Sequence, residues 1–411
     1  MTGVQMRSKG EMQGSPTEER ALNPLPRSEL ERRWAATRAY MREAGVDALV
    51  VGGTSASANG HLRWFTGIPY LGGNSRTAIF PIEGLMTMVE HGDTDGVSRS
   101  NGNSPGGPGV GLRLATPAHM FSVDYTGGHE ADLLAREIKA AKYVTIGFVH
   151  PGGMYHGVAG PLETALDGVR IINATDGIDH LIAVKSEVEI GLVRAAASMQ
   201  DDIIAKLREF IRPGLRDADI VAYAEYLGKV AGSSDGTFLA SSSPAGQPAP
   251  LRPRHQHART LRAGDAFTIL VENNGPGAYF AEIMRTFVLG KAPQELKDGF
   301  ALMCEAQHNT MRHVRPGARG ADIMAAHNAF MRAYGLAEER RLHCHGQGYA
   351  LVQRPLARPD ETMTIAANMN VTAHPWFDNG RIFATVCDNF LIGPDGPSER
   401  LHRTPQEIFE L

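Results

Sequence analysis

The segment HCHGQGYALVQRP, residues 343–355, gathers side chains that could do chemistry. His343, Cys344 and His345 occupy consecutive positions and are followed by glycines. Imidazole and thiolate groups can bind a metal ion, and a thiol can act as a nucleophile with a histidine as its base. The pattern is equally compatible with a packed strand end. On an extended segment His343 and His345 share one face, whereas Cys344 faces the opposite side, where we expect the core.

An internal repeat indicates how such residues are positioned. The segment FIRPGLRDADIVAYAEYLGKVAGS at 210–233 is echoed by HVRPGARGADIMAAHNAFMRAYGL at 313–336. In each copy a helix is expected to end before Pro-Gly, and a second helix follows. Two copies are too few for a solenoid, so they indicate one domain of two pseudo-symmetric halves, each with helices backing antiparallel strands. A site between the halves would draw its groups from distant positions.

The region before the repeat has the pattern of an α/β domain. Residues 28–53 combine helical apolar spacing with a following β-rich run, and further β-like runs occur, for example at 76–82. Glycine-rich segments here lack the spacing of a phosphate-binding loop. We expect a flexible arm at 1–28, an α/β domain at 29–178 and a catalytic domain at 179–411.

Composition restricts the partners. The chain has 411 residues, 42% of them hydrophobic, and a formal charge of −4, so it can bury a large core and carries no basic excess for nucleic acid. No apolar run reaches the length of a membrane span, and no signal peptide is evident. Three cysteines without CxxC spacing favour a reducing cytoplasm over a disulfide framework or a zinc ribbon. We expect a small-molecule substrate, without nucleic acid or membrane partners.

Several motifs, taken in order, resemble one family. These are HLRWFTG (61–67), VKSEVEIGLVRAAA (184–197), GDAFTILVENNGPGAYFAEIMRTFVLG (264–290), HGQGYALVQRP (345–355), NMNVTAHP (368–375) and FATVCDNFLIGPDG (383–396). Together they resemble the pita-bread enzymes, which include methionine aminopeptidase, prolidase, aminopeptidase P and creatinase. The resemblance implies an α/β N-terminal domain, an α+β pita-bread catalytic domain with an internal pseudo-twofold repeat, and a homodimer.

The same resemblance identifies the positions of the metal ligands. Metallopeptidases of this family hold two ions with Asp, Asp, His, Glu and Glu. The matching positions here are Glu272 (or Val271, without a gap), Glu282, His345, His374 and Cys387. A pair of hard divalent ions needs several anionic oxygens, and at most two carboxylates remain. We therefore expect a divergent branch without a metal or other cofactor; the alternative is a single zinc ion.

Without a metal, two imidazoles and a carboxylate form an acid–base set. His374 is the foremost catalytic candidate, with His345 beside it, and Glu282 can fix the tautomer of either ring. Cys387 could be a nucleophile, although a buried inert thiol is the favoured interpretation. His343 lies outside the family motif and is expected to be structural.

The remaining candidates would bind substrate. Arg285 could pair with an anionic substrate or form a structural salt bridge, and the aromatic residues suit a flat molecule or the core equally well. His255 lies near the position of the creatinase catalytic histidine. The substrate-binding candidates are Arg285, Tyr279, Tyr349, Trp376, His255 and Glu272.

The leading hypothesis is a metal-independent acid–base lyase acting on a small, possibly aromatic metabolite, by retro-aldol aldehyde release or β-elimination. The first alternative is a metal-free C–N hydrolase similar to creatinase or ectoine hydrolase. Two others are a peptidase of the Xaa-Pro type that depends on one zinc ion or on manganese, and an inactive peptidase fold that serves as a binding protein.

Overall fold

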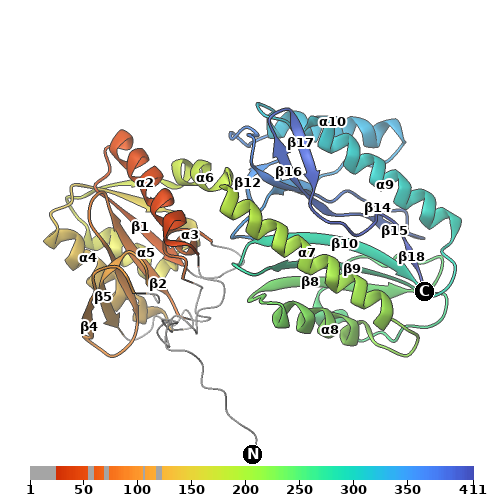
Figure 1. Ribbon diagram of the computed structural model, residues 1–411, viewed down its shortest axis with the longest axis horizontal. Coiled ribbons are helices and arrows are strands. Elements are labelled where there is room, and N and C mark those ends of the chain that lie inside the picture. The colour runs from red at the N-terminus through yellow and green to blue at the C-terminus, as the bar shows by residue number, and fades with distance from the viewer. Residues whose placement is uncertain (1–24, 54–59, 69–73, 105–106, 117–122) are drawn as a thin grey trace, which may run out of the picture.

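The fold consists of two groups of elements that lie side by side and are linked through α6, Thr175–Ala183 (Figure 1). The computed structural model describes residues 25–53, 60–68, 74–104, 107–116 and 123–411. Most of the predicted arm at 1–28 therefore lies outside the described residues, and the domain limits at 178/179 stay a prediction. No helix in the described ranges has the length and apolar character needed to cross a membrane.

The N-terminal group contains one mixed sheet with strand order β4-β5-β3-β2-β1-β6-β7. Its strands are β1 Ala48–Gly53, β2 Arg76–Pro81, β3 Met86–His91, β4 Val97–Arg99, β5 Val110–Thr116, β6 Thr145–Val149 and β7 Arg170–Asn173. The helices besides α6 are α2 Arg27–Ala44, α3 His61–Thr66, α4 Gly127–Ala140 and α5 His156–Ala165, with 3-10 turns η1 Asp124–Thr126 and η2 Pro151–Gly153. Strand β1 pairs antiparallel with β2 and parallel with β6.

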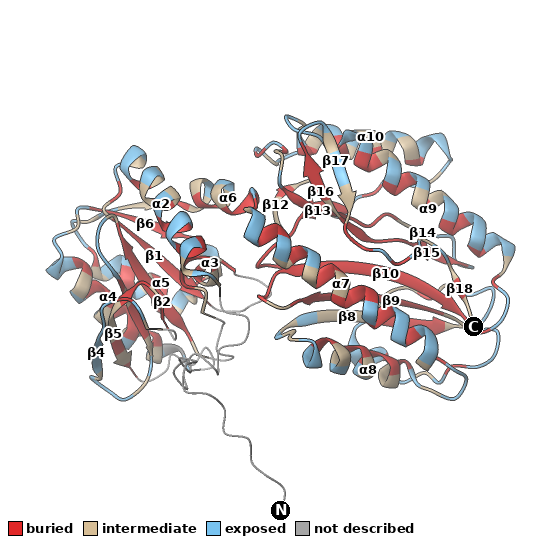
Figure 2. Cartoon of the chain, viewed as in Figure 1, coloured by how far each residue is buried: buried red, intermediate tan, exposed pale blue. Residues whose placement is uncertain are grey.

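Helices cover both faces of this sheet. Leu49 and Val51 of β1 share a core with Trp34 of α2, whereas Val50 shares a second core with Leu134 of α4. Because successive strand residues point to opposite faces, a strand between two helical layers must be apolar throughout. This explains why β1 is buried along its whole length (Figure 2).

The C-terminal group contains two larger sheets, β18-β10-β9-β8 and β12-β11-β13-β16-β17, and the hairpin β14-β15. The first half comprises α7 Glu187–Phe210, α8 Asp217–Val230, β8 Gly236–Ser243, η3 Arg254–Gln256, β9 Ala266–Asn274 and β10 Phe280–Val288. The second comprises α9 Gln294–His313, α10 Gly320–Ala333, β11 Cys344–Gly346, β12 Gln353–Leu356, β13 Asn370–Ala373, β14 Trp376–Asp378, β15 Phe383–Thr385, β16 Asp388–Gly393, β17 Gly396–Arg400 and β18 Phe409–Glu410.

The sequence repeat corresponds to a structural repeat. Helices α7 and α9 each end just before an Arg-Pro-Gly turn, in which Gly214 and Gly317 adopt φ angles of 94° and 84°. A side chain rarely tolerates this backbone, which accounts for glycine at both positions. After each turn a single β-bridge precedes the next helix, Arg216 with Thr260 and Arg319 with Thr364. The two halves are therefore built alike.

The two sheets meet between β10 and β16. Met284 of β10 forms a β-bridge with Cys387, and its amide donates to the Cys387 carbonyl at 3.3 Å. Two residues earlier, the Glu282 amide donates to Oδ1 of Asn389 at 2.7 Å. The junction thus brings a strand of the first half against strands of the second.

Candidate active site

Three of the predicted residues converge at this junction: Glu282 of β10, His345 of β11, and His374, which follows β13 directly. All three side chains are buried, and one ligand atom from each lies within 4.8 Å of the other two. Nε2 of His345 is 3.9 Å from Oε2 of Glu282, and the two imidazole centroids are 5.3 Å apart. We call these residues the Glu-His-His group.

The hydrogen bonds of His345 determine which nitrogen faces the carboxylate. Nδ1 of His345 donates to the Gly346 carbonyl at 2.9 Å, because a carbonyl oxygen can only accept. Nε2 therefore presents a lone pair toward Glu282. In the described part of the chain, Oε2 of Glu282 and Nδ1 of His374 have no hydrogen-bond partner. Buried acceptors that face one another are costly unless a proton or a cation lies between them.

Burial controls the charge of the group. It raises the pKa of Glu282 to about 7, although hydrogen bonds from Cys387 and Thr372 oppose the rise. It lowers the pKa of His345 to about 4, and that of His374 well below its ordinary value. Both imidazoles are thus neutral at neutral pH, which is the form that binds a metal ion.

The donor set fits one ion better than two. Glu272 stands opposite Glu282 in the β9–β10 register, but its Oε1 accepts from Nε2 of Gln347 at 3.1 Å. Cys387 holds its Sγ 3.0 Å from Oγ1 of Thr372, and burial raises the pKa of this thiol well above its usual range. The group therefore offers one carboxylate and two imidazoles, a set typical of a single transition-metal ion.

Two further histidines border the group. His343 is fully buried and stacks on His327 of α10, with ring centroids 3.9 Å apart. Neither ring nitrogen of His343 has a hydrogen-bond partner among the described residues. The alternation of the strand places His343 on the side of His345, as expected. His327 was not predicted, because a histidine within a helical repeat copy carries no signal of its own.

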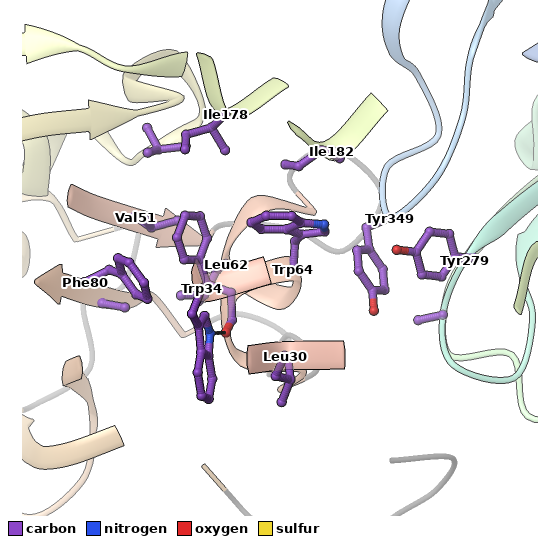
Figure 3. Packing of buried hydrophobic residues seen from close by; sticks show 14 of the residues in the cluster. Leu30, Trp34, Val51, Leu62, Trp64, Phe80, Ile178, Ile182, Tyr279 and Tyr349 are labelled. Atoms are coloured by element: carbon purple, nitrogen blue, oxygen red, sulfur yellow. Dashed lines mark hydrogen bonds between the residues drawn. The ribbon is translucent and has the colours of Figure 1, made fainter. Parts of the chain in front are cut away.

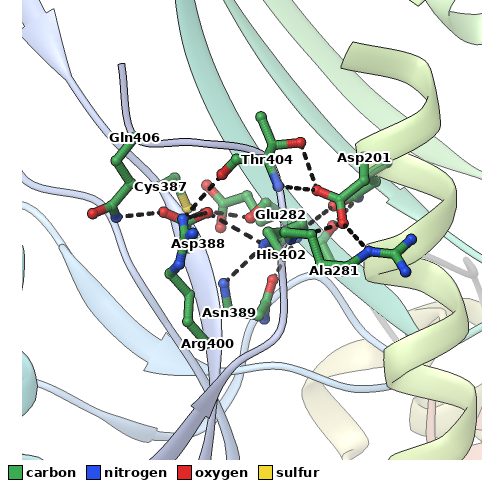
Figure 4. Close-up of polar contacts among 12 residues, drawn as sticks. Asp201, Ala281, Glu282, Cys387, Asp388, Asn389, Arg400, His402, Thr404 and Gln406 are labelled. Atoms are coloured by element: carbon green, nitrogen blue, oxygen red, sulfur yellow. Dashed lines mark hydrogen bonds and ion pairs between the residues drawn. The ribbon is translucent and has the colours of Figure 1, made fainter. Parts of the chain in front are cut away.

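Arg285 is not brought to the Glu-His-His group. It is 0% exposed and pairs with Asp388 at 2.7 Å, and its other donors go to main-chain carbonyls, including that of Cys387 at 3.0 Å. Figure 4 shows the network around Asp388, which also accepts from Nε2 of Gln406 at 2.7 Å. This arrangement favours the structural salt bridge over substrate binding.

The predicted aromatic residues divide between two places. Tyr279 and Tyr349 pack against each other where the catalytic strands meet the N-terminal core (Figure 3), with ring centroids 4.1 Å apart. Trp376 follows His374 by two residues and is partly exposed. His255 is exposed on η3 and is not one of the three residues of the group.

The amino-acid sequence is similar to those of known peptidases. Residues 191–394 match metallopeptidase family M24. The probable dipeptidase PepE of Mycobacterium tuberculosis is 28% identical over 253 residues, covering 60% of this chain and 66% of that protein. The Xaa-Pro dipeptidase of Pyrococcus horikoshii is 25% identical over 240 residues, covering 57% of this chain and 66% of that protein. The chain thus spans slightly under two thirds of the length of these relatives.

Solved structures extend the likeness to nearly the whole chain. The dipeptidase PepE of Mycobacterium ulcerans superimposes with a TM-score of 0.72 at 21% identity, covering 94% of this chain and 99% of that one. The X-Pro aminopeptidase of Thermotoga maritima gives 0.74 at 18% identity, covering 92% and 99%. The predicted fold, an α/β domain followed by a pita-bread domain, is confirmed.

Two predictions are wrong. The relatives are named as dipeptidases and Xaa-Pro peptidases, which contradicts a lyase acting on a non-peptide metabolite. A pocket without a metal is contradicted by the metallopeptidase match and by the convergence of Glu282, His345 and His374. The physical reason is that counting carboxylates ignores imidazoles, which bind transition metals as well. The chain belongs to the pita-bread family, and its residues 191–394 to metallopeptidase family M24.

Proposed function

We propose that the chain is a metal-dependent peptidase that cleaves short peptides and holds one divalent transition-metal ion with Glu282, His345 and His374. The observation that carries the proposal is the convergence of three buried ligand side chains. Oε2 of Glu282 and Nδ1 of His374 also lack a hydrogen-bond partner in the described part of the chain. A divalent ion in such a place polarises a carbonyl oxygen and lowers the pKa of a bound water. The names of the relatives support a peptide substrate.

The chain prepares this group through its own contacts. The Gly346 carbonyl holds the proton of His345 on Nδ1 and leaves Nε2 available. Asn389 fixes the backbone of Glu282 by accepting its amide proton at 2.7 Å. Its Nδ2 also donates to Oε1 of Gln347 at 2.8 Å, and Gln347 in turn binds Glu272. Asn389 and Gln347 thus connect the backbone of Glu282 to the carboxylate of Glu272.

Glu272 is suited to carry a proton. Burial, together with the charge of Glu282, raises the pKa of Glu272 well above its ordinary value, which favours its protonated form. Opposite residues of an antiparallel pair share a face of the sheet, which puts Glu272 on the side of Glu282. We propose that Glu272 donates the proton that the departing amine of a cleaved peptide requires.

Metal content tests the site before any substrate is known. Purified protein, stripped and reloaded with zinc or manganese, is measured by elemental analysis. We expect about one ion per chain in the wild type, and a loss of most of it in Glu282→Gln and in His374→Ala. Glu272→Gln is the matched control, because it removes a carboxyl charge directly across the β9–β10 pair and should keep the ion. Two tightly held ions per chain would contradict the single-ion site.

Activity is tested on the loaded protein with a panel of dipeptides and tripeptides, including Xaa-Pro sequences, by quantifying free amino acids. We expect hydrolysis by the wild type, and a fall in kcat of about 10²–10⁴-fold in Glu272→Gln without loss of metal. Failure of the loaded protein to cleave any of these peptides would overturn the peptidase assignment.

The homodimer implied by the family resemblance also remains a proposal. Light scattering combined with gel filtration measures the mass of the native particle directly. A mass twice that of the 44.4 kDa chain supports it, and a monomer contradicts it.

A further inference from the structure

One cationic side chain stands at the outer end of the strands that carry the two ligand histidines. Cys344 pairs with Ala373 across β11 and β13, and the amide of His374 donates to the carbonyl of His343 at 2.8 Å. Two residues further out, the guanidinium carbon of Arg341 lies 4.3 Å from the centroid of the Trp376 ring. Arg341 and Trp376 therefore form the next cross-strand contact beyond the histidines.

The side chains of the two strands become more exposed to solvent from the histidines outward to Arg341 and Trp376. His343 is fully buried and His374 nearly so, whereas Trp376 is partly exposed and the Arg341 side chain is 44% exposed. The row thus leads from solvent to the Glu-His-His group. Side chains two residues apart on an extended segment lie about 7 Å apart, which is also about the length of two extended peptide residues.

Among the described residues, Glu339 is the one that accepts hydrogen bonds from the Arg341 guanidinium. Glu339, itself buried, accepts from Nη2 at 2.6 Å, from Nε at 3.1 Å and from the Arg341 amide at 2.7 Å. Asn328 fixes Glu339 in turn by accepting its amide proton at 2.8 Å. Nη1 of Arg341 forms no hydrogen bond with any described residue. The guanidinium is thus a planar group that is already oriented, and its Nη1 can donate hydrogen bonds to a carboxylate.

The guanidinium lies on the same cross-strand row as His343 and His374, two residues further out on each strand. It is not a metal ligand itself.

We propose that Arg341, stacked on Trp376, binds the C-terminal carboxylate of a short peptide whose scissile bond lies at the Glu-His-His group. This inference rests on the proposed peptidase function and adds the residue that selects free-acid peptides of short length. A peptide with a blocked terminus lacks the carboxylate that Nη1 would bind, and a long peptide places it too far away.

The test compares a cleaved dipeptide with its C-terminal amide. The wild type should prefer the free acid by at least about tenfold in kcat/KM, and Arg341→Gln should remove this preference through KM while kcat stays within about threefold. Arg341→Lys, which keeps the charge but not the planar fork, should retain part of it. The matched control is Arg340→Gln, since Arg340 is exposed and adjacent and forms no interaction with described residues; it should behave as the wild type.

Removing Arg341 also uncovers the charge of Glu339, which could itself repel a carboxylate. The double variant Arg341→Gln/Glu339→Gln separates the two effects, because it removes both charges. We expect the double variant to lack the free-acid preference as well. If it regains that preference, or if Arg341→Gln never loses it, the proposed role of Arg341 is wrong.

A binding measurement separates this inference from the peptidase function. Trp34 and Trp64 lie in the N-terminal core, so a change of tryptophan fluorescence on titrating metal-free protein with the dipeptide should disappear in Trp376→Phe. If carboxylate-dependent binding is present and is lost in Arg341→Gln while no peptide is cleaved, the subsite stands and the peptidase assignment fails. If the free acid and the amide are cleaved equally well, the peptidase assignment stands and the carboxylate subsite at Arg341 is wrong.

Discussion

Nη1 of Arg33 in α2 donates a hydrogen bond to the hydroxyl of Tyr349 at 3.3 Å, joining positions 316 residues apart. The same guanidinium donates from Nη2 to the hydroxyl of Tyr279 at 3.3 Å and pairs with Glu189 at 2.9 Å. Tyr279 precedes Glu282 of β10 by three residues, and Tyr349 follows β11, the strand that carries His345. Arg33 is 0% exposed, so one buried cation of the N-terminal group fixes the ends of two catalytic strands.

Replacement of Arg33 by methionine should destabilise the protein strongly. The substitution keeps much of the side-chain volume but removes the buried cation beside Glu189 and Glu29, which keep the partly exposed Arg32 as an ionic partner. Breaking a buried ion pair from one side costs about 3–5 kcal/mol. Urea denaturation of the metal-free protein measures the free energy of unfolding.

The control for this prediction is Arg194→Gln. Arg194 pairs with Glu399 at 2.7 Å, but both side chains are well exposed, so the expected loss is below about 1 kcal/mol. Equal losses in the two variants would show that Arg33 does not connect the two groups of elements in the way its contacts indicate.

The sequence predicted the pseudo-symmetric catalytic half because both Arg-Pro-Gly turns need the same backbone. It could not assign Tyr279 and Tyr349 to the boundary with the N-terminal elements. Both lie inside the quoted motifs, close to ligand positions, and an aromatic ring there fits a pocket as well as a core. The decision depends on Arg33, which is hundreds of residues away in the chain, and no local pattern records such a contact.

Glu282, His345 and His374 were placed together through the family resemblance, because each matches a ligand position. Their convergence was thus predictable, but the residue types led to a metal-free site as the main prediction and to a single zinc ion only as the alternative. For Arg285 the prediction left substrate binding and a structural salt bridge open, and the strand spacing favours the second. Arg285 lies three positions after Glu282 on one strand, and residues at an odd spacing face opposite sides of a sheet.

The three cysteines should be unreactive in the native protein. Burial raises the pKa of Cys304 and of Cys344 to about 12 each, and that of Cys387 well above its usual range. Only the thiolate attacks a disulfide reagent, so we expect negligible reaction with Ellman's reagent at pH 8, and reaction of all three cysteines after denaturation in guanidinium.

A positive control for this assay is Val230→Cys. Val230 is 70% exposed at the end of α8, so a cysteine there should react within the mixing time of the reagent. Rapid labelling of Cys387 in otherwise native protein would instead revive a nucleophilic role for that thiol.

The metal-free protein should lose stability as the pH rises toward neutrality. Burial raises the pKa of Glu282 in the folded state from 4.5 to about 7. A group whose pKa is higher in the folded state than in the unfolded state stabilises the folded protein fully when the pH is below the pKa of the unfolded state. This stabilisation is lost as the pH rises through the pKa of the folded state. For Glu282 the stabilisation amounts to about 3 kcal/mol. Glu282→Gln removes the titrating group, so this variant should become more stable than the wild type between about pH 5 and pH 8.

A bound metal ion should make the wild type more stable than Glu282→Gln. A divalent ion binds the ionised carboxylate, so at pH 7.5 a concentration of zinc 100 times the dissociation constant should stabilise the wild type by about 2.7 kcal/mol and leave Glu282→Gln nearly unchanged. Thermal unfolding of both proteins at pH 5.5 and pH 7.5, with and without zinc, gives the four comparisons. The lowered pKa of His345 has the opposite pH dependence, but both proteins share that residue, and their difference reports Glu282. If the difference in stability between the wild type and Glu282→Gln does not vary with pH, burial does not raise the pKa of Glu282 in the folded protein.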